Sequence, residues 1–325
     1  MKKTALRRRT AIAGSLLAPL LRAGTATAQD YPSRPMQIIV PFGPGGSGDI
    51  SARLFGNFLE QEWKQPVAVI NRPGANGLIG TAALKAAAPD GYTIGIASSS
   101  THPAAPLLYK DVPYDWVHDF THIGLFGVVG SVAVVRAESP IRTLPEFVAY
   151  AKAKPGKVFF GYFNTTSQIP AEIFKVRAGL AMEGVGYKAI GSAFTDLLGE
   201  QIDLIFVDYV AASSHINGGK VRPLAITEAK RRPAWPDVPA MAEFYPGFDF
   251  KGYVALTAPA KVPEEIVTRL NGALREAQKT PDVRKRLEDL GFTIRDYDVA
   301  QYNAFVAAEG KAWAEYVKIA KLTPQ

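Results

Sequence analysis

The sequence predicts an α/β protein of two lobes, each with a mainly parallel sheet flanked by helices. Apolar runs of strand length alternate with helical patterns over most of the 325 residues, and glycine-rich or hydroxyl-rich loops follow several of these runs. Two long apolar stretches, 123–135 and 249–258, suit crossover strands that lead from one lobe to the other and back. Such sheets bind ligands at the carboxyl ends of their strands, so a cleft is expected between the lobes.

The first lobe opens with strands and helices in turn. A buried strand is expected at Met36–Phe42 and a helix at Asp49–Trp63. A second strand at Val67–Asn71 leads into an Ala-rich helix at 79–88, and a Pro-Asp-Gly turn then starts a strand at 92–98. Strands separated by helices in this way favour parallel pairing.

The second lobe and the tail continue the pattern. Thr143 and Glu146 form a capping-box signature that opens a helix ending near Pro155. The other elements expected are strands at 157–163, 201–209 and 221–227, helices at 263–279, 282–290 and about 300–321, and a strand candidate at Phe292–Asp296.

The first 28 residues have the layout of a secretory signal, with a basic start, an apolar stretch and Ala26-Thr27-Ala28 before the expected cleavage. The Arg-Arg-Arg run at 7–9 fits the twin-arginine pattern loosely, so the Sec and twin-arginine routes both stay open. Six of the 37 basic residues and none of the 30 acidic ones lie in this segment. The remainder therefore has a formal charge of +1, which gives no electrostatic reason to expect nucleic acid as a partner.

Residue types argue against catalysis. The chain has no cysteine, which excludes disulfides, thiolate nucleophiles and cysteine-type zinc sites. The Gly45–Asp49 segment misses the G-x-S-x-G elbow, since Asp occupies its last position. His118 and His122 have the i, i+4 spacing of metal ligands, but no carboxylate motif accompanies them and a structural role is expected. We therefore expect a binding protein without a metal or cofactor, and not an enzyme.

The loop after the first strand, Gly43-Pro44-Gly45-Gly46-Ser47-Gly48, has the G-x-G-x-x-G spacing of a dinucleotide site. Pro44 removes an N–H donor, and the second strand ends in Asn71 where an acid would bind ribose hydroxyls. Arg72 suits a 2′-phosphate, so an NADP-dependent oxidoreductase stays open as the alternative. The same backbone N–H groups and helix start also bind a carboxylate, and a plain tight turn without ligand is the third reading.

Three further loops offer hydroxyls or amides where strands end. They are Ser98–Thr101, Asn164–Ser167 and Gly191-Ser192 before another helix. Each alone is explained as a helix cap, but together, with Arg72 as the one cation among them, they suggest an anion held by neutral donors.

Several stretches, in order, resemble the periplasmic substrate-binding receptors of tripartite tricarboxylate transporters, the Bug or TctC-like type. They are YPSRPMQIIVPFGPGGSGD, NRPGANGLIGTAALKAAAPDGYT, YDWVHDF, DLLGEQIDLIF, GGKVRPLAIT and WPDVPAMAEFYPGF, and the resemblance covers Tyr31 to about Lys321. It implies a type II periplasmic-binding-protein fold whose lobes close on a small carboxylate. It further implies delivery to membrane permease subunits, and we expect a monomer. The expected parts are a signal peptide at 1–28, a first lobe at 29–126 plus 252–325, and a second lobe at 127–251.

The resemblance also implies where the ligand binds. In the family the loop matched by Pro44–Asp49 holds a carboxylate through backbone amides and waters, and the other lobe contributes the segments matched by Asn164–Ser167 and Ala189–Ser192. The residues expected to act at the first lobe are Pro44, Gly45, Gly46 and Ser47 as the carboxylate loop, Asp49 to cap the helix and fix that loop, Asn76 and Gly77 as a wall, and Ser98, Ser100 and Thr101 as hydroxyl donors. In that loop the amides of Gly45, Gly46 and Ser47 are expected to bind the carboxylate. Those expected at the second lobe are Asn164, Thr165, Thr166, Ser167, Ala189, Ser192 and Asp208.

Departures from the family pattern lie on the second-lobe side. YFNTTSQIPAE replaces a Gly/Ser-rich stretch and a His-Leu pair, and Ala189 replaces the glycine of a Tyr-Lys-Gly triplet. The acid expected after Phe206 is Val207, with Asp208 one position later. Asp208 can accept a hydrogen bond from a ligand hydroxyl or amine, cap a helix or form an ion pair. The nature of the carboxylate (di- or tricarboxylate, amino acid or aromatic acid) stays open.

Overall fold

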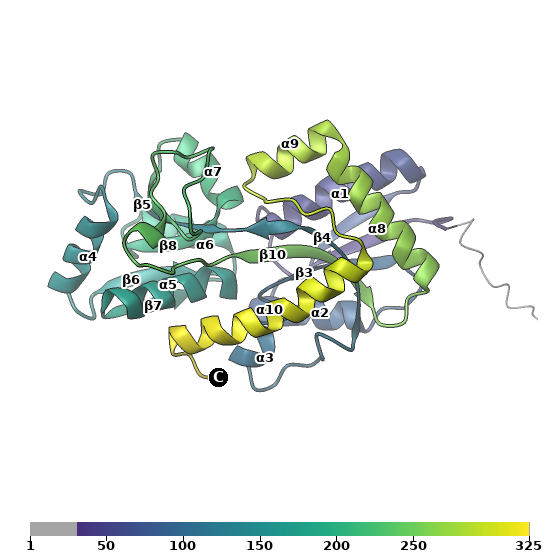
Figure 1. Cartoon of the computed structure of the whole chain (residues 1–325), viewed down its shortest axis with the longest axis horizontal. Coiled ribbons are helices and arrows are strands. Elements are labelled where there is room, and N and C mark those ends of the chain that lie inside the picture. Colours follow the sequence, from purple (N-terminus) through teal and green to yellow (C-terminus); the bar gives the residue numbers. More distant parts are fainter. Residues whose placement is uncertain (1–30, 325) are drawn as a thin grey trace, which may run out of the picture. The chain divides into compact units, whose positions relative to one another are not determined.

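The computed structural model describes residues 31–324, so the predicted signal peptide lies outside the described residues. Two five-stranded sheets carry helices on their faces (Figure 1). Nowhere between residues 31 and 324 is a helix both long enough and apolar enough to cross a bilayer.

The first sheet has the strand order β2-β1-β3-β10-β4. β1 pairs in parallel with β2 and β3, because helices return the chain to the same edge between these strands. β10 runs antiparallel between β3 and β4, so four of the five strands point the same way. The strands are β1 Met36–Val40, β2 Val67–Asn71, β3 Thr93–Ser98, β4 Phe120–Val129 and β10 Gly252–Pro259.

The second sheet repeats this plan with the order β7-β6-β8-β5-β9. β6 pairs in parallel with β7 and β8, and β5 runs antiparallel between β8 and β9. Four of its five strands again share one direction, which confirms the mainly parallel sheets. The strands are β5 Ser131–Arg136, β6 Val158–Tyr162, β7 Met182–Gly186, β8 Leu204–Asp208 and β9 Val221–Ile226.

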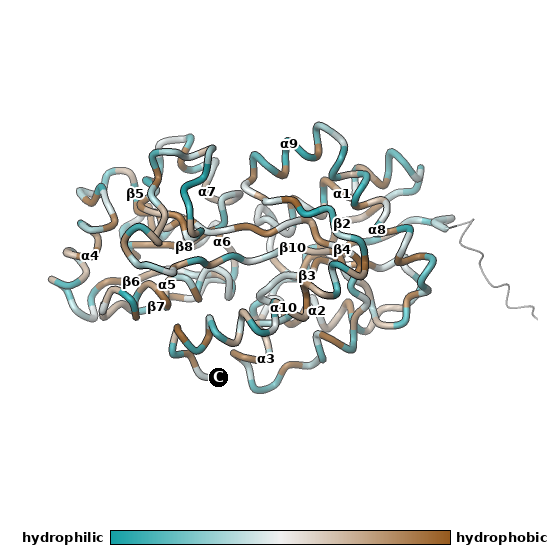
Figure 2. The backbone as a smooth tube through the Cα atoms, viewed as in Figure 1, coloured by the Kyte–Doolittle hydropathy of each residue, from teal (hydrophilic) through white to brown (hydrophobic). Residues whose placement is uncertain are grey.

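The helices lie between strands or in the tail. They are α1 Ser47–Trp63, α2 Leu78–Lys85, α3 Ala105–Leu108, α4 Leu144–Ala153, α5 Thr165–Ala178, α6 Ile190–Leu198, α7 Tyr209–Asn217, α8 Glu264–Lys279, α9 Pro281–Asp289 and α10 Val299–Ala320, with short 3₁₀ turns at Ala75–Gly77 and Met241–Glu243. Along the tube of Figure 2, apolar positions gather on the strands, whereas α9 shows mostly polar ones.

Two connections join the sheets. The apolar stretch 123–135 forms most of β4 and β5, which Gly130 alone separates. On the way back, the Phe250 N–H donates to the Thr227 carbonyl beyond β9, at 2.9 Å, before β10 begins at Gly252. The predicted crossover strand at 123–135 is therefore two strands, β4 in the first sheet and β5 in the second. The one predicted at 249–258 forms β10, which belongs to the first sheet only.

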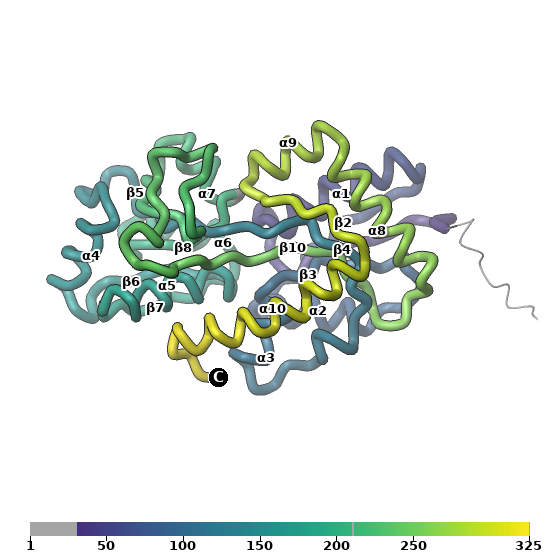
Figure 3. Tube along the Cα trace, viewed as in Figure 1, coloured from purple at the N-terminus to yellow at the C-terminus, as the bar shows by residue number. Residues whose placement is uncertain are grey.

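Helix α10 contributes to the cores of both sheets. Tyr302 and Val306 in its first half pack with Leu125 of β4 and Tyr253 of β10. Trp313, Val317 and Ala320 in its second half belong to the larger core cluster around the second sheet. Figure 3 shows α10 as the yellow end of the trace, beside β10. The lobe boundaries given above stay a prediction, and α10 is a helix that both lobes share.

Two elements differ from the sequence-based expectation. Phe292–Asp296 is not a strand, and only a single bridge joins Thr293 to Val128. β7 was not predicted, because Gly184 and Gly186 interrupt it and only Met182 of its five residues is fully buried. An exposed, glycine-containing edge strand lacks the apolar run by which strands are recognised.

Candidate functional site

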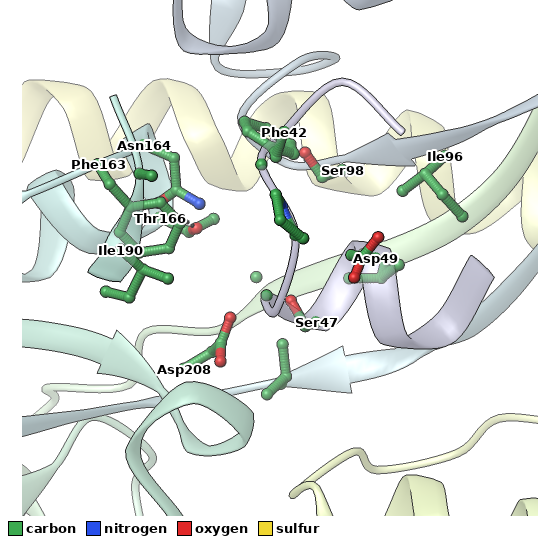
Figure 4. A pocket seen from close by; sticks show the side chains of 18 of the residues that line it. Phe42, Ser47, Asp49, Ile96, Ser98, Phe163, Asn164, Thr166, Ile190 and Asp208 are labelled. Atoms are coloured by element: carbon green, nitrogen blue, oxygen red, sulfur yellow. Dashed lines mark hydrogen bonds between the residues drawn. The ribbon is translucent and has the colours of Figure 1, made fainter. Parts of the chain in front are cut away.

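One cavity lies where the carboxyl ends of strands from both sheets meet (Figure 4). Its volume is about 50 Å³, which is room for a few water molecules. It is lined by Phe42, Gly43, Pro44, Gly46, Ser47, Gly48, Asp49, Ile96, Ser98, Val129, Ser131, Phe163, Asn164, Thr166, Lys188, Ala189, Ile190, Asp208, Gly252, Tyr253 and Val254. Gly43 lies near the opposite side, since an added Cβ there would be 3.7 Å from the Ala189 Cβ.

The start of α1 forms the first-sheet wall of this cavity. Gly45 turns the chain with φ +90°, and Gly46 caps the helix in an extended conformation without any side-chain hydrogen bond. The first N–H groups of a helix have no partner inside it, and the helix dipole places partial positive charge there. Because the cap is a glycine, these donors at Ser47 and Gly48 open directly into the cavity, which suits an anion.

Asp49 fixes the loop and is itself neutralised. Its carboxylate accepts from the Gly45 N–H at 3.0 Å, from Asn71 at 2.9 Å, and from Arg53 at 2.9 and 3.1 Å. Burial raises the pKa of Asp49, but these hydrogen bonds and the Arg53 charge outweigh burial and hold it below its usual value. Asp49 thus holds the loop through Gly45, but it does not cap α1, whose N-cap Gly46 has no side-chain hydrogen bond. The Gly45 N–H was expected to bind the carboxylate and is instead bound to Asp49.

The same network bears on the dinucleotide alternative. The Asn71 amide donates to Asp49 and to the Phe42 carbonyl, at 2.9 and 3.0 Å, while its oxygen accepts from Arg53. The side chain at the end of β2 is thus held inward, where a ribose would need an acceptor turned outward.

The hydroxyls after β3 divide into different roles. Ser98 lines the cavity. The Ser100 hydroxyl accepts from the Thr166 N–H at 3.2 Å and so links the two sides. Thr101 turns away from the cavity, because its hydroxyl bonds within its own turn, to the Ser98 backbone and to His102.

Asn76 and Gly77 lie outside the main cavity. They line an adjoining one together with Phe42, Phe163 and Lys188. The Asn76 amide is hydrogen-bonded to the Tyr109 hydroxyl. Gly77 has φ +91°, so its turn favours a residue without a side chain.

On the second-sheet side, α5 is capped by its own residues. Asn164 accepts from the Ser167 N–H and from the Thr166 hydroxyl, each at 2.9 Å. Asn164 and Thr166 line the cavity, whereas Thr165 and Ser167 are buried behind them. The predicted hydroxyl set is therefore brought into the cavity only in part.

Helix α6 also begins at the cavity. Ala189 is its N-cap and provides no side-chain hydrogen bond, so its first amides are open in the manner of α1. Helix α6 starts at Ile190, so Gly191 and Ser192 are inside its first turn, and the exposed Ser192 does not line the cavity.

Asp208 faces α1 from the other side of the cavity. It caps α7, where its carboxylate accepts from the Ala211 N–H at 2.9 Å. Figure 4 shows it directed toward the loop that carries Ser47, which also lines the cavity. Burial raises the pKa of Asp208, and the hydrogen bonds from Ala211 and Ser47 offset that rise only in part.

Some lining residues were missed by sequence reasoning. Lys188 is a cation at the cavity, in contrast to the expectation that Arg72 alone is near. It follows Tyr187 in a loop whose position depends on β7, the strand that was not predicted. Phe42 and Phe163 are the last residues of two predicted strands, so their position at the carboxyl end of a strand could have identified them. Ser131 and Tyr253 lie on the strands that connect the sheets.

His118 and His122, which have the spacing of metal ligands in the sequence, lie in different surroundings in the described structure. His118 is exposed, whereas His122 is buried with its ring 5.8 Å from that of His102. Burial lowers the pKa of His122 to about 4, so its imidazole ring is neutral at physiological pH. Residues 31–324 contain no group of three or more potential metal-ligating His, Asp or Glu side chains.

Comparisons with known proteins agree with this arrangement. The family model "Tripartite tricarboxylate transporter family receptor" matches residues 52–322. Protein BugT of Bordetella pertussis (strain Tohama I) is 36% identical over 312 residues, which cover 95% of this chain and 96% of that protein. The periplasmic binding protein BugD has a similar structure, with a TM-score of 0.85 and 30% identity over 91% of this chain and 100% of that one. The R. palustris protein Rpa4515 with adipate has a TM-score of 0.88 and 28% identity over the same shares. The chain belongs to the tripartite tricarboxylate transporter receptor family, whose members are solute-binding proteins.

Proposed function

We propose that this protein is a periplasmic receptor that captures a small carboxylate between its two sheets and delivers it to membrane permease subunits. One observation carries the proposal: the uncapped start of α1 opens into the cavity shared by both sheets. Backbone N–H groups at a helix start bind a carboxylate without a cationic side chain, and the dipole adds to their attraction. The adipate bound by Rpa4515 is a carboxylate of this kind.

In the proposed mode, the N–H groups of Ser47 and Gly48 hold one carboxylate, while Asp49 keeps the loop in place. Ser98 offers a hydroxyl from the first sheet, and Asn164 and Thr166 approach the ligand from the second. The uncapped start of α6 at Ala189 gives a second set of amides for the far end of the ligand. Thr101, Thr165, Ser167 and Ser192 support the loops and do not contact the ligand, and Asn76 and Gly77 line its entrance.

Opening and closing follow from the contacts across the cavity. The two sides meet across the cavity, where the Thr166 N–H donates to Ser100 and Gly43 lies near Ala189, so we propose that the sides part to admit a ligand. The Thr166–Ser100 hydrogen bond, which joins the two sides, then breaks to admit the ligand. The segment at Gly130 and residues 249–251 are the proposed hinge, because only these connect the sheets between strands. We propose a monomer, since each copy holds a whole cavity.

Thermal-shift screening of the mature chain, residues 29–325, tests this function. A panel of di- and tricarboxylates, amino acids and aromatic acids is compared with NADP, the ligand of the alternative function. A ligand well above its Kd raises the melting temperature, by an amount equal to about 2.7 kcal/mol of stability at a hundredfold excess over Kd. At least one carboxylate is expected to do so. Stabilisation by NADP together with no response to any carboxylate would overturn the proposal.

A further inference from the structure

We infer that the ligand carries an ammonium group next to its carboxylate, because Asp208 presents a second carboxylate to the same helix start. This inference rests on the proposed function and narrows its ligand class to amino acids and related zwitterions. The position where the family resemblance implies an acid is Val207 in this chain, and Asp208 follows it.

Asp208 and the start of α1 face each other across the cavity. Asp208 ends β8 on the second sheet, and Ser47 begins α1 on the first. Both line the cavity, and Asp208 is directed toward the loop that carries Ser47. The Ala211 N–H, 2.9 Å from the carboxylate, holds Asp208 from behind. A ligand carboxylate on the Ser47 and Gly48 amides would therefore lie beside the carboxylate of Asp208.

The charged side chains that line the cavity are only partly paired. Three charged side chains line the cavity, and Asp49 among them is paired with Arg53 at 2.9 Å. Lys188 is exposed and Asp208 half-buried, and within residues 31–324 neither has an ion pair. The cavity is thus lined by one carboxylate and one ammonium group that are not paired with each other, and the carboxylate, Asp208, faces the helix start that attracts anions.

Two carboxylates in contact are unfavourable unless a cation lies between them. A positive charge within about 4–6 Å of a carboxylate shifts its protonation equilibrium toward the charged form by roughly ten- to a thousandfold, which measures the strength of the attraction. An α-ammonium group is one carbon away from its carboxylate, so it can bind Asp208 while the carboxylate binds α1. A cation far along the ligand would lie away from Asp208 when the ligand carboxylate occupies the start of α1. A hydroxyl at the same position donates one hydrogen bond but brings no charge, so hydroxy acids should rank between the two.

The test uses matched pairs of acids that differ by one ammonium group. Aspartate and succinate, glutamate and glutarate, alanine and propionate, and phenylalanine and 3-phenylpropionate are titrated calorimetrically into the mature protein at neutral pH. Asp208→Asn keeps the cap of α7, since Asn is as good an N-cap as Asp. Asp298→Asn is the matched control, because Asp298 caps α10 by accepting from the Gln301 N–H at 2.8 Å and does not line the cavity.

For the pair that binds, the amino acid is expected to bind at least about tenfold more tightly than its deaminated partner in the wild type and in Asp298→Asn. In Asp208→Asn the ratio should fall toward one, mainly through weaker binding of the amino acid. Equal or tighter binding of the deaminated acid to the wild type, or an unchanged ratio in Asp208→Asn, would overturn the inference while the proposed function stands. If no acid of either series binds, the carboxylate-receptor proposal itself fails.

Discussion

Replacement of Asp49 by Ala tests whether the ligand loop is held by side chains behind it. Asp49 is 3% exposed and accepts four hydrogen bonds, from the Gly45 N–H, Asn71 and Arg53. Asp49→Ala leaves all of these donors without that partner. The Gly45 backbone is exposed and the Arg53 side chain is 49% exposed, so water replaces part of the loss there. The half-buried Asn71 has less access to water.

The expected loss of stability is about 2–3 kcal/mol. A hydrogen bond to a charged group contributes about 1.5–3 kcal/mol and an unsatisfied buried group costs about 1–3 kcal/mol, but these terms overlap. For a protein of this size the loss corresponds to a fall in melting temperature of roughly 3–5 °C. The loop should also bind carboxylates less tightly, since its conformation is no longer fixed in advance.

The pH dependence gives a second signature. The folded-state pKa of Asp49 is lowered, so its contribution is complete above the unfolded value of 3.8 and is lost as pH falls below it. Urea unfolding at pH 7 and near pH 3.5 is compared for wild type, Asp49→Ala and Asp289→Ala. Asp289 pairs with Lys285 at 2.6 Å on the surface, where such a pair contributes less than about 1 kcal/mol. Equal losses in the two variants at pH 7, or a loss for Asp49→Ala that does not shrink at low pH, would refute the reasoning.

Substitutions at three further positions test other parts of the structure. Burial raises the pKa of Glu309 to about 7, so its ionised form destabilises the fold as pH rises from 4.5 through 7. Glu309→Gln should therefore raise the melting temperature more at pH 8 than at pH 5. The gain in the free energy of unfolding at pH 8 should be at most about 3 kcal/mol, and an equal rise in melting temperature at both pH values would contradict this. Gly77→Ala should cost about 1–3 kcal/mol in denaturant unfolding, because φ is +91° and its Cβ would lie 2.6 Å from Thr101; a neutral effect would show that the turn relaxes. Asn164→Ala should lower stability by about 1 kcal/mol through loss of the α5 cap, whereas Asn164→Asp should not, and thermal unfolding of the pair decides.

Much of the fold was predictable because its strands are buried and bounded by turn residues. Val67–Asn71 was predicted with its bounds, and the second predicted helix contains most of α2. β7 was missed because its glycines and exposed side chains give no apolar period. Phe292–Asp296 has a strand-like composition, but the chain there reaches the sheet at one residue only.

The site was predictable as a set of loops and less so as a set of side chains. Loops at strand ends meet at one edge of a sheet, and this placed Gly46, Ser47, Ser98 and Thr166 at the cavity. Which hydroxyl turns inward depends on the phase of a helix or turn, so Thr101 could not be separated from Ser98. The Asp208–Ser47 contact joins residues far apart in the chain, and only the packing of the two sheets brings it about.

The central claim is that backbone amides at the start of α1 hold the ligand carboxylate, and Gly46→Val tests it most directly. An added Cβ at Gly46 meets no atom within 4 Å and φ is −86°, so the fold should tolerate the side chain while it covers the amides. Gly272→Val in α8 is the control, since its Cβ also meets no atom within 4 Å and Gly272 does not line the cavity. Calorimetric titration uses the carboxylate that stabilises the wild type most. We predict that Gly46→Val weakens binding at least about tenfold, equivalent to 1.4 kcal/mol, and that Gly272→Val does not. Unchanged affinity in Gly46→Val would contradict the account.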